Sequence, residues 1–502
     1  MPTIQLTHFT FGFATQAQPL FQDVSLNLDT GWHLGLVGRN GRGKTTLLRL
    51  LQGQLTGRGT LVMPRTAPYF PQPILDPSQL TLDAMQAVST AEQWQLEREL
   101  RQLNVDPAIL WRPYADLSGG EQTKVRLALL FALPDQFALI DEPTNHLDAA
   151  SRAQVAAYLK RQSGFIVISH DRDFLDAVTD HTLALDKQTV TLTAGNYSAY
   201  ASAKANQDAF EQATDAKLRQ DIARLKQTAR QKAQWATSRE GDKHGDPHQP
   251  GSGAVANKGF IGARAARVMQ KRKNLEHRLD RELTAKAQLL QNIETVPALT
   301  LNTVPDHHEV YLDVQDLWLD YDGQPLFAPV SFTLRRGDRL ALVGPNGSGK
   351  SSLIAALLHQ FTGTVHGTIR IPQSLTLSAQ RQTYGDNRGP LQAFAAAHHL
   401  DHETFLNNLK KLGVPREAFT LPIEHLSAGQ QKKVELARCL GTPASLMIWD
   451  EPLNYLDLAN QEQLTASVLA HQPTLLVVEH DAAFIHKVAT QIVTLTPPTG
   501  DK

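Results

Sequence analysis

The chain has 502 residues, of which 41% are hydrophobic and 20% charged, and its formal net charge at pH 7 is −1. This length exceeds one ordinary hydrophobic core, so we expect about three domains, or two domains and a substantial connector. No apolar run reaches the roughly 18 residues of a membrane-spanning helix, and the N-terminal segment lacks the pattern of a signal peptide. The single cysteine, Cys439, excludes an internal disulfide. We therefore expect a globular, cytoplasmic protein.

Four motifs follow one another in the first half of the chain and return in the same order in the second half. In the first half they are GRNGRGKTT (38–46), LSGGEQTKVRLA (117–128), FALIDEPTNHLD (137–148) and IVISHD (166–171). In the second half they are GPNGSGKSS (344–352), LSAGQQKKVELA (426–437), LMIWDEPLNYLD (446–457) and LVVEHD (476–481). Ser118 precedes Asp141 by 23 positions, and Ser427 precedes Asp450 by the same 23. This agreement indicates a tandem duplication.

The glycine-rich motif of each copy predicts a nucleotide site. Each follows an apolar segment directly, and a strand that leads through a glycine loop into a helix is the setting of a phosphate-binding loop. Lys44 and Lys350 are expected to reach the β- and γ-phosphates, and the Thr45 and Ser351 hydroxyls to ligate Mg²⁺. The residues expected to hold the nucleotide are Gly38, Asn40, Gly41, Gly43, Lys44, Thr45 and Thr46, and in the second copy Gly344, Asn346, Gly347, Gly349, Lys350, Ser351 and Ser352.

Further polar residues follow the apolar segments of each copy, where the ligands of parallel sheets bind. Asp141 and Asp450 are expected to hold the water shell of the metal, and Glu142 and Glu451 to orient and partly deprotonate an attacking water. His170 and His480, as neutral imidazoles, would hydrogen-bond the γ-phosphate. Gln72 and Gln380 are candidates for contacting the metal or the water. The pattern predicts Mg²⁺-dependent ATP hydrolysis at two sites.

LSGGE, LSAGQ, EPTNHLD and EPLNYLD identify a family, because these segments resemble those of ATP-binding-cassette (ABC) ATPases. The resemblance implies an α/β fold with two P-loop NTPase cassettes that close head to tail around two ATP molecules. It implies that each nucleotide also contacts the LSGG-type segment of the opposite cassette, through Ser118, Gly119 and Gly120 or through Ser427, Gly429 and Gln430. By the same analogy Phe13 and Tyr321 would stack on adenine. Ala428 departs from the pattern, and it would weaken the site of Lys44 if its backbone requires a positive φ.

The remaining segment separates a first domain at 1–198 from a second at 301–502, and we expect a linker at 199–300. Its leucines recur at helical spacing on both sides of a Gly/Pro-rich break, which predicts a long helical hairpin. Residues 201–294 contain 18 basic and 11 acidic residues, a net charge of +7. Such a surplus favours a polyanionic partner bound through its phosphates. The candidate RNA contacts are Arg264, Arg267, Lys271, Arg272 and Lys273.

The segment GNYSAY (195–200), followed by a basic hairpin and a second cassette, is similar to the ABC-F family. That resemblance implies a ribosome partner, with the linker directed at the tRNA and the peptidyl-transferase region. The segment NKGFIGARAARVMQKRKNLEHR (257–278) resembles the branch that protects ribosomes from lincosamide, streptogramin A and pleuromutilin antibiotics. Two alternatives stay open, namely an ABC-F translation factor without a resistance role and a fused ATPase subunit of an ABC importer.

Overall fold

The computed structural model describes residues 2–13, 19–145, 147–186, 190–210 and 297–498, and ten single residues between 213 and 281. The chain forms two compact units, one with Met1–Tyr200 and Val296–Lys502 and the other with Ala201–Thr295. The candidate RNA contacts between Arg264 and Lys273 lie outside the described residues. In the second unit, residues 201–210 and the ten single residues are helical.

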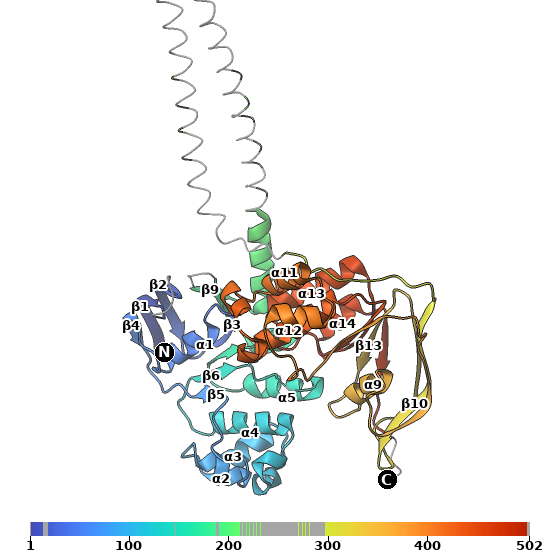
Figure 1. Ribbon diagram of the computed structural model, residues 1–502. Coiled ribbons are helices and arrows are strands. Elements are labelled where there is room, and N and C mark those ends of the chain that lie inside the picture. Colours follow the sequence, from blue (N-terminus) through green and yellow to red (C-terminus); the bar gives the residue numbers. More distant parts are fainter. Residues whose placement is uncertain are drawn as a thin grey trace, which may run out of the picture. The chain divides into compact units, whose positions relative to one another are not determined.

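The first cassette combines an antiparallel sheet with a mainly parallel one (Figure 1). The antiparallel sheet has the order β2-β1-β4, with β1 (Thr3–Phe11), β2 (Phe21–Asp29) and β4 (Arg58–Val62). The larger sheet has the order β5-β6-β7-β3-β8-β9, with β3 (His33–Val37), β5 (Tyr69–Phe70), β6 (Ala138–Asp141), β7 (Phe165–Ile168), β8 (His181–Leu185) and β9 (Val190–Ala194). Its helices are α1 (Lys44–Leu51), α2 (Thr81–Gln86), α3 (Gln93–Gln102), α4 (Gly119–Phe131), α5 (Ala149–Leu159) and α6 (Arg172–Val178).

The second cassette repeats this plan. Its antiparallel strands are β10 (Val310–Tyr321), β11 (Gln324–Pro325), β12 (Val330–Arg335) and β14 (Thr364–Arg370). Its parallel sheet has the order β15-β16-β17-β13-β18, with β13 (Arg339–Val343), β15 (Leu377–Gln380), β16 (Leu446–Asp450), β17 (Thr474–Val478) and β18 (Gln491–Thr494). Its helices are α9 (Lys350–Leu357), α10 (Leu391–Ala397), α11 (His402–Lys411), α12 (Ala428–Gly441), α13 (Leu458–His471) and α14 (Ala482–Val488). The α/β fold with duplicated P-loop cassettes is confirmed.

The central strands of both parallel sheets are buried along their length. Every residue of β7 and of β17 is buried, as expected for strands that are covered on both faces. One face of each parallel sheet is covered by several helices, and the other by α1 or α9 together with the antiparallel sheet, so that separate buried clusters lie on the two sides. Because parallel strands end at one edge, the residues that follow β3, β6 and β7 meet there, as do those that follow β13, β16 and β17.

Candidate functional site

The two glycine loops have the conformation that a phosphate-binding loop requires. Gly43 and Gly349 precede α1 and α9 at φ of 90° and 81°, in the left-handed region that favours glycine. A Cβ at Gly43 would lie 2.6 Å from Leu20, and one at Gly349 would lie 2.8 Å from Phe327. The packing beneath each loop thus also requires glycine, and each helix begins at the predicted lysine.

Both lysines are held inside their loops. The Lys44 ammonium donates to the carbonyl of Gly38 at 2.6 Å, and that of Lys350 donates to the carbonyl of Gly344 at 2.9 Å. Burial lowers the pKa of both lysines, which nearby carboxylates oppose. The two ammonium groups are therefore pre-positioned cations in partly desolvated surroundings, where attraction to a phosphate is stronger than in water.

The hydroxyl and the aspartate that should hold magnesium are adjacent in both copies. Thr45 donates to Asp141 at 2.9 Å, and Asp450 accepts a hydrogen bond from Ser351. Burial raises the pKa of Asp450 to about 6 despite that bond, and its Oδ1 has no hydrogen-bond partner among the described residues. A buried carboxylate oxygen without a donor, next to a hydroxyl, fits a hard cation such as Mg²⁺.

The glutamates that follow these aspartates share an unusual backbone conformation. Glu142 and Glu451 have φ of 53° and 50°, which a residue with a side chain rarely adopts. Their N–H groups donate across the sheet to the carbonyls of Ile168 and Val478, at 2.9 Å in both cases. The same strained geometry in both copies, at the end of the same strand, supports a functional position.

Each glutamate lies near the predicted histidine. His170 Nε2 is 3.3 Å from Glu142 Oε1, and His480 Nε2 is 3.9 Å from Glu451 Oε1. Burial, and then the positive charge of Lys44, lowers the pKa of His170, while burial raises that of Glu142. Burial also lowers the pKa of His480 to about 4. Both imidazoles are thus neutral at physiological pH and able to hydrogen-bond a phosphate.

The two glutamines do not occupy equivalent positions. Gln380 ends β15 beside Trp449, directly before Asp450, and neither atom of its buried amide is hydrogen-bonded to a residue that the structure describes. Gln72 instead lines a cavity of about 480 Å³ with Gln86, Leu129 and other side chains.

In the first copy a tyrosine, which sequence reasoning missed, contacts the metal-site aspartate. The hydroxyl of Tyr69 donates to Asp141 Oδ2 at 2.9 Å, and burial raises the pKa of Tyr69, so that it stays a donor.

The LSGG-type segments open helices as predicted. Ser118 and Ser427 cap α4 and α12, each in a reciprocal capping box, in which Gln430 is the partner of Ser427. Ala428 is the first residue of α12 and is absent from the positive-φ residues of the described chain. Ala428 would weaken the site of Lys44 only if its backbone required a positive φ, and it does not. Alanine is well suited to the helical backbone of this first turn.

The two cassettes meet through a pair of aspartates that the sequence reading also missed. Asp457 accepts the Asn40 N–H at 2.8 Å, and Asp148 accepts the Asn346 N–H at a longer 3.5 Å. The other oxygen of each aspartate caps the helix that follows it, α13 or α5. Leu458, next to Asp457, packs in a buried cluster of the first cassette. Each glycine loop is thus bonded to the end of the NHLD or NYLD segment of the opposite cassette.

The proposed adenine-stacking rings are exposed. Phe13 is 41% exposed and packs edge to face on Phe11, and Tyr321 is 45% exposed with its ring centroid 4.9 Å from that of Phe361. Both rings have an accessible surface, and stacking on adenine stays a prediction.

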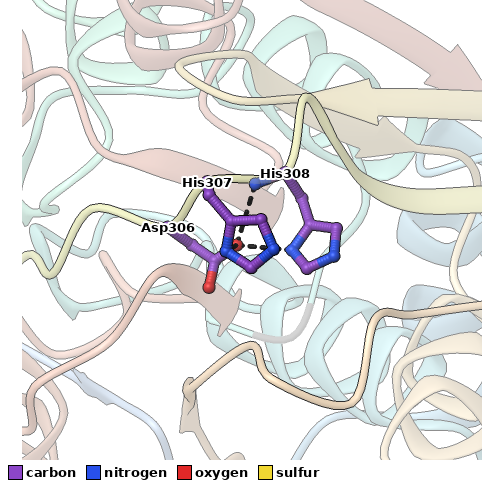
Figure 2. Close-up of side chains that lie close together, drawn as sticks. All are labelled: Asp306, His307 and His308. Atoms are coloured by element: carbon purple, nitrogen blue, oxygen red, sulfur yellow. Dashed lines mark hydrogen bonds and ion pairs between the residues drawn. The ribbon is translucent and has the colours of Figure 1, made fainter.

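Another group of potential ligands lies in the second cassette just before β10 (Figure 2). Asp306 Oδ1 lies 2.6 Å from His308 Nδ1 and 3.5 Å from His307 Nδ1, and it also accepts the backbone N–H of His308 at 2.9 Å. The aspartate thus closes a turn before β10, with its oxygen already bonded to His308, and His307 is highly exposed.

Comparisons with known proteins agree with this architecture. Residues 21–145 and 327–454 match the family described as ABC transporter. The chain is 30% identical over 488 residues to the ribosome protection protein VmlR of Bacillus subtilis, covering 95% of this chain and 84% of that protein. It is 27% identical to the tylosin resistance ATP-binding protein TlrC of Streptomyces fradiae, covering 92% of each.

Solved structures share the fold at lower identity. The archaeal ribosome recycling factor aABCE1, solved with the ribosomal stalk protein aP1, has a TM-score of 0.63 at 19% identity, covering 97% of this chain and 87% of that one. Within the described parts of the chain, no helix combines the length and apolar character needed to cross a bilayer.

Proposed function

Because the chain belongs to the ABC-F family of tandem ATP-binding-cassette ATPases and resembles its ribosome-protection branch, we propose that it binds the ribosome under the control of ATP. The observation that carries this proposal is a pair of glycine loops, each with its lysine, aspartate, glutamate and histidine, on either side of a sequence segment (201–294) with a net charge of +7. Such a segment attracts polyanions, and ribosomal and transfer RNA present dense phosphates. The relative described as a ribosome protection protein supports the same partner.

The chain's own residues account for hydrolysis. Thr45 with Asp141, and Ser351 with Asp450, would hold Mg²⁺, which neutralises charge on the β- and γ-phosphates when bound. The carboxylate of Glu142 or Glu451 would orient the attacking water and take its proton.

The lysine and the histidine near each glutamate would stabilise the γ-phosphate. Lys44 or Lys350 would attract it with a positive charge, and the neutral imidazole of His170 or His480 would donate a hydrogen bond to it.

ATP is proposed to hold the cassettes together. The helices α4 and α12 begin at Gly119 and Ala428, and the N–H groups of such a first turn attract anions. We expect each to close on the γ-phosphate in the opposite glycine loop, so that Ser427 serves the site of Lys44 and Ser118 that of Lys350. The contacts of Asp457 and Asp148 with the opposite loops are consistent with this head-to-tail pairing. Hydrolysis would remove the shared phosphate and release the ribosome.

Stopping hydrolysis tests this cycle. The double variant Glu142→Gln, Glu451→Gln should bind ATP, stay closed and sediment with 70S ribosomes. The matched control adds Lys44→Ala and Lys350→Ala to that variant, which should weaken ATP binding and leave the protein in the supernatant. Sedimentation free of ribosomes in the presence of ATP would refute ribosome binding. Co-purification with a membrane permease would favour the alternative of an importer subunit.

The linker is proposed to reach toward the tRNA and the peptidyl-transferase region through its basic residues. Changing Arg264, Arg267 and Lys271 together to Glu should abolish ribosome association and leave basal ATPase activity unchanged, because phosphate attraction is reversed while the cassettes are untouched. An equal loss of both activities would mean that these charges only support folding.

Resistance is the finer part of the proposal. Cytoplasmic expression in a drug-sensitive host should raise the inhibitory concentration of a lincosamide, a streptogramin A or a pleuromutilin. No change with any class would favour the alternative of a translation factor without a resistance role, and it would leave ribosome binding intact.

A further inference from the structure

The helix that opens the linker is fastened to α6 of the first cassette. This helix begins at residue 197, after Asn196, whose side-chain oxygen accepts the N–H of Ala199 at 3.1 Å. Asp176 of α6 accepts the N–H of Ser198 at 2.7 Å, and its second oxygen accepts the Ser198 hydroxyl. Both oxygens of one carboxylate therefore hold the first turn of the linker helix, as an acidic group does at a helix N-terminus.

The opposite end of α6 contacts the second cassette. Arg172, its first residue, lies 3.1 Å from Glu462 Oε1 and donates to the carbonyl of Leu458 at 3.2 Å, both on α13. Gln461, also on α13, donates to the carbonyl of His170 at 3.1 Å. His170, which we propose hydrogen-bonds the γ-phosphate, lies two residues before α6. His170 and its counterpart His480 are called the sensor histidines below.

The two contacts lie one helical turn apart on α6. Arg172 and Asp176 are four positions apart, a spacing that places side chains on the same face of a helix. Tyr197, in the first turn of the linker helix, is close enough to Arg172, Glu462 and Asp176 that their charges affect its pKa, which burial raises to about 12. Tyr197 and Ala177 pack against the same buried cluster of the first cassette. A hydrogen-bonded turn with packed side chains moves as one piece.

The duplicated cassette supplies an internal comparison. Counting from the sensor histidine, Ala482 and His486 of α14 replace Arg172 and Asp176. After α14 the chain of the second cassette continues into β18, as the first cassette continues from α6 into β8. The residues that make both contacts are therefore found in the copy that precedes the linker.

We propose that α6 transmits closure of the cassettes to the linker, with Arg172 as its contact to the second cassette and Asp176 as its anchor for the linker helix. ATP-driven closure repositions α13, and the Arg172 contacts carry α6 with it. Asp176 then shifts the start of the linker helix through Ser198. This inference rests on the proposed ATP-gated function, because it requires that the linker responds to the nucleotide.

Distance measurements between spin labels test the coupling without ribosomes. The native Cys439 is buried, so labels attach to introduced cysteines. Labels at Asn206→Cys and Ala470→Cys report the distance between the linker helix and the second cassette, and we call them the linker pair. Labels at Gln102→Cys and Gln392→Cys report the distance between the two cassettes, and we call them the closure pair. All four positions are exposed. The labels are placed in the Glu142→Gln, Glu451→Gln variant, which should bind ATP without hydrolysing it. In this variant the addition of ATP should change both label distances.

Asp176→Ala should separate the two responses. The closure pair should shift as before, while the ATP-induced shift of the linker pair should fall at least twofold. Asp176→Asn can still form hydrogen bonds with Ser198, so it should restore the ATP-induced shift of the linker pair. Ser198→Ala loses the hydroxyl but keeps the backbone N–H, so its shift should be intermediate between those of the original protein and Asp176→Ala. Asp173→Ala removes an exposed acid from the same helix and should change neither distance.

Several results would overturn the proposal. An unchanged linker shift in Asp176→Ala would do so, and so would loss of closure, because the contacts of Asp176 that carry the proposal are to Ser198. Thermal unfolding checks that each variant is folded, and Ser198→Ala provides the second test if Asp176→Ala is not. Failure of the background variant to sediment with ribosomes would refute the proposed function separately, since the distances are measured without ribosomes.

Discussion

The buried carboxyl of Glu479 provides the sharpest test of the energetics. It precedes the sensor histidine of the second cassette and is 4% exposed. Its two oxygens accept the N–H groups of His480 at 2.8 Å and of Leu453 at 3.2 Å. In the first cassette the same position is Ser169, whose hydroxyl is hydrogen-bonded to that of Thr144 at 2.9 Å. The copies thus join the same two loops with different chemistry.

Burial raises the pKa of Glu479 to about 7 from an ordinary value of 4.5, despite the two N–H donors. The folded protein therefore retains a proton that the unfolded chain releases, and folding is disfavoured as pH rises through this range. A rise of about 2.5 in pKa corresponds to about 3 kcal/mol, at about 1.4 kcal/mol for each pH unit. Most of this, about 2 to 3 kcal/mol, should be lost between roughly pH 5 and 8.

Glu479→Gln should remove this pH dependence. Gln resembles the protonated carboxyl, so the variant and the original protein should have similar stability near pH 5. Near pH 8 the variant should be more stable, with a melting temperature higher by roughly 4 to 12 °C for a domain of this size. Tryptophan fluorescence, to which buried Trp449 contributes, follows the unfolding. Glu403→Gln on the surface of α11 is the matched control and should leave the pH dependence unchanged.

A parallel pH dependence of stability in Glu479→Gln and the original protein would refute this reasoning. It would mean that the carboxyl is ionised and adequately solvated at neutral pH, so that burial does not dominate its pKa.

Three further predictions concern the ATP sites and the core. Ala428→Gly should leave ATPase activity at the Lys44 site within about twofold and lower stability by up to about 1 kcal/mol, because alanine favours the helix there; a clear gain in activity would contradict this. Asp457→Ala should reduce that activity more than Asp148→Ala reduces the activity of the other site, because its inter-cassette bond is shorter. Glu435→Gln should lower the free energy of unfolding, measured with denaturant at pH 7, by about 3 kcal/mol. Burial would raise the pKa of Glu435, but Arg438 and other donors outweigh it and hold the pKa at about 2. The stabilisation from Glu435 is present above about pH 4.5 and is lost toward pH 2.

Much of the site was predictable from the sequence, because its residues belong to continuous motifs at strand ends. The glycine loops, the two lysines and the Asp-Glu pairs each occupy a few consecutive positions, and a parallel sheet brings its strand ends to one edge. The side chains that complete the site could not be predicted in this way. Asp457 and Asp148 reach the opposite loops only because two copies pack together, and spacing within one copy contains no information on that packing.

The glutamines illustrate the limit of counting residues. Gln72 and Gln380 lie at nearly equal distances along the chain from the LSGG-type segments, and the sequence makes both of them candidates for contacting the metal or the water. In the sheets, however, Gln380 pairs with Trp449, and the residue in the same place of the first cassette is Phe70, paired with Ile140. Tyr69, one position earlier, contacts Asp141 instead. Strand register decides which side chain faces the metal site, and interval lengths do not report register.

The duplication shows which parts of this protein need not be alike. Both copies keep the glutamate with positive φ, the buried histidine and the lysine bonded to its own loop, as the proposed phosphate chemistry requires. They differ in the side chains just outside that chemistry: the Thr144–Ser169 bond is replaced by Glu479, and Arg172 by Ala482. These positions do not contact the reacting groups but connect them to neighbouring loops, to the opposite cassette and, in the first copy alone, to the linker. Divergence there, with the catalytic residues retained, is the pattern expected if both sites hydrolyse ATP while one of them directs the linker.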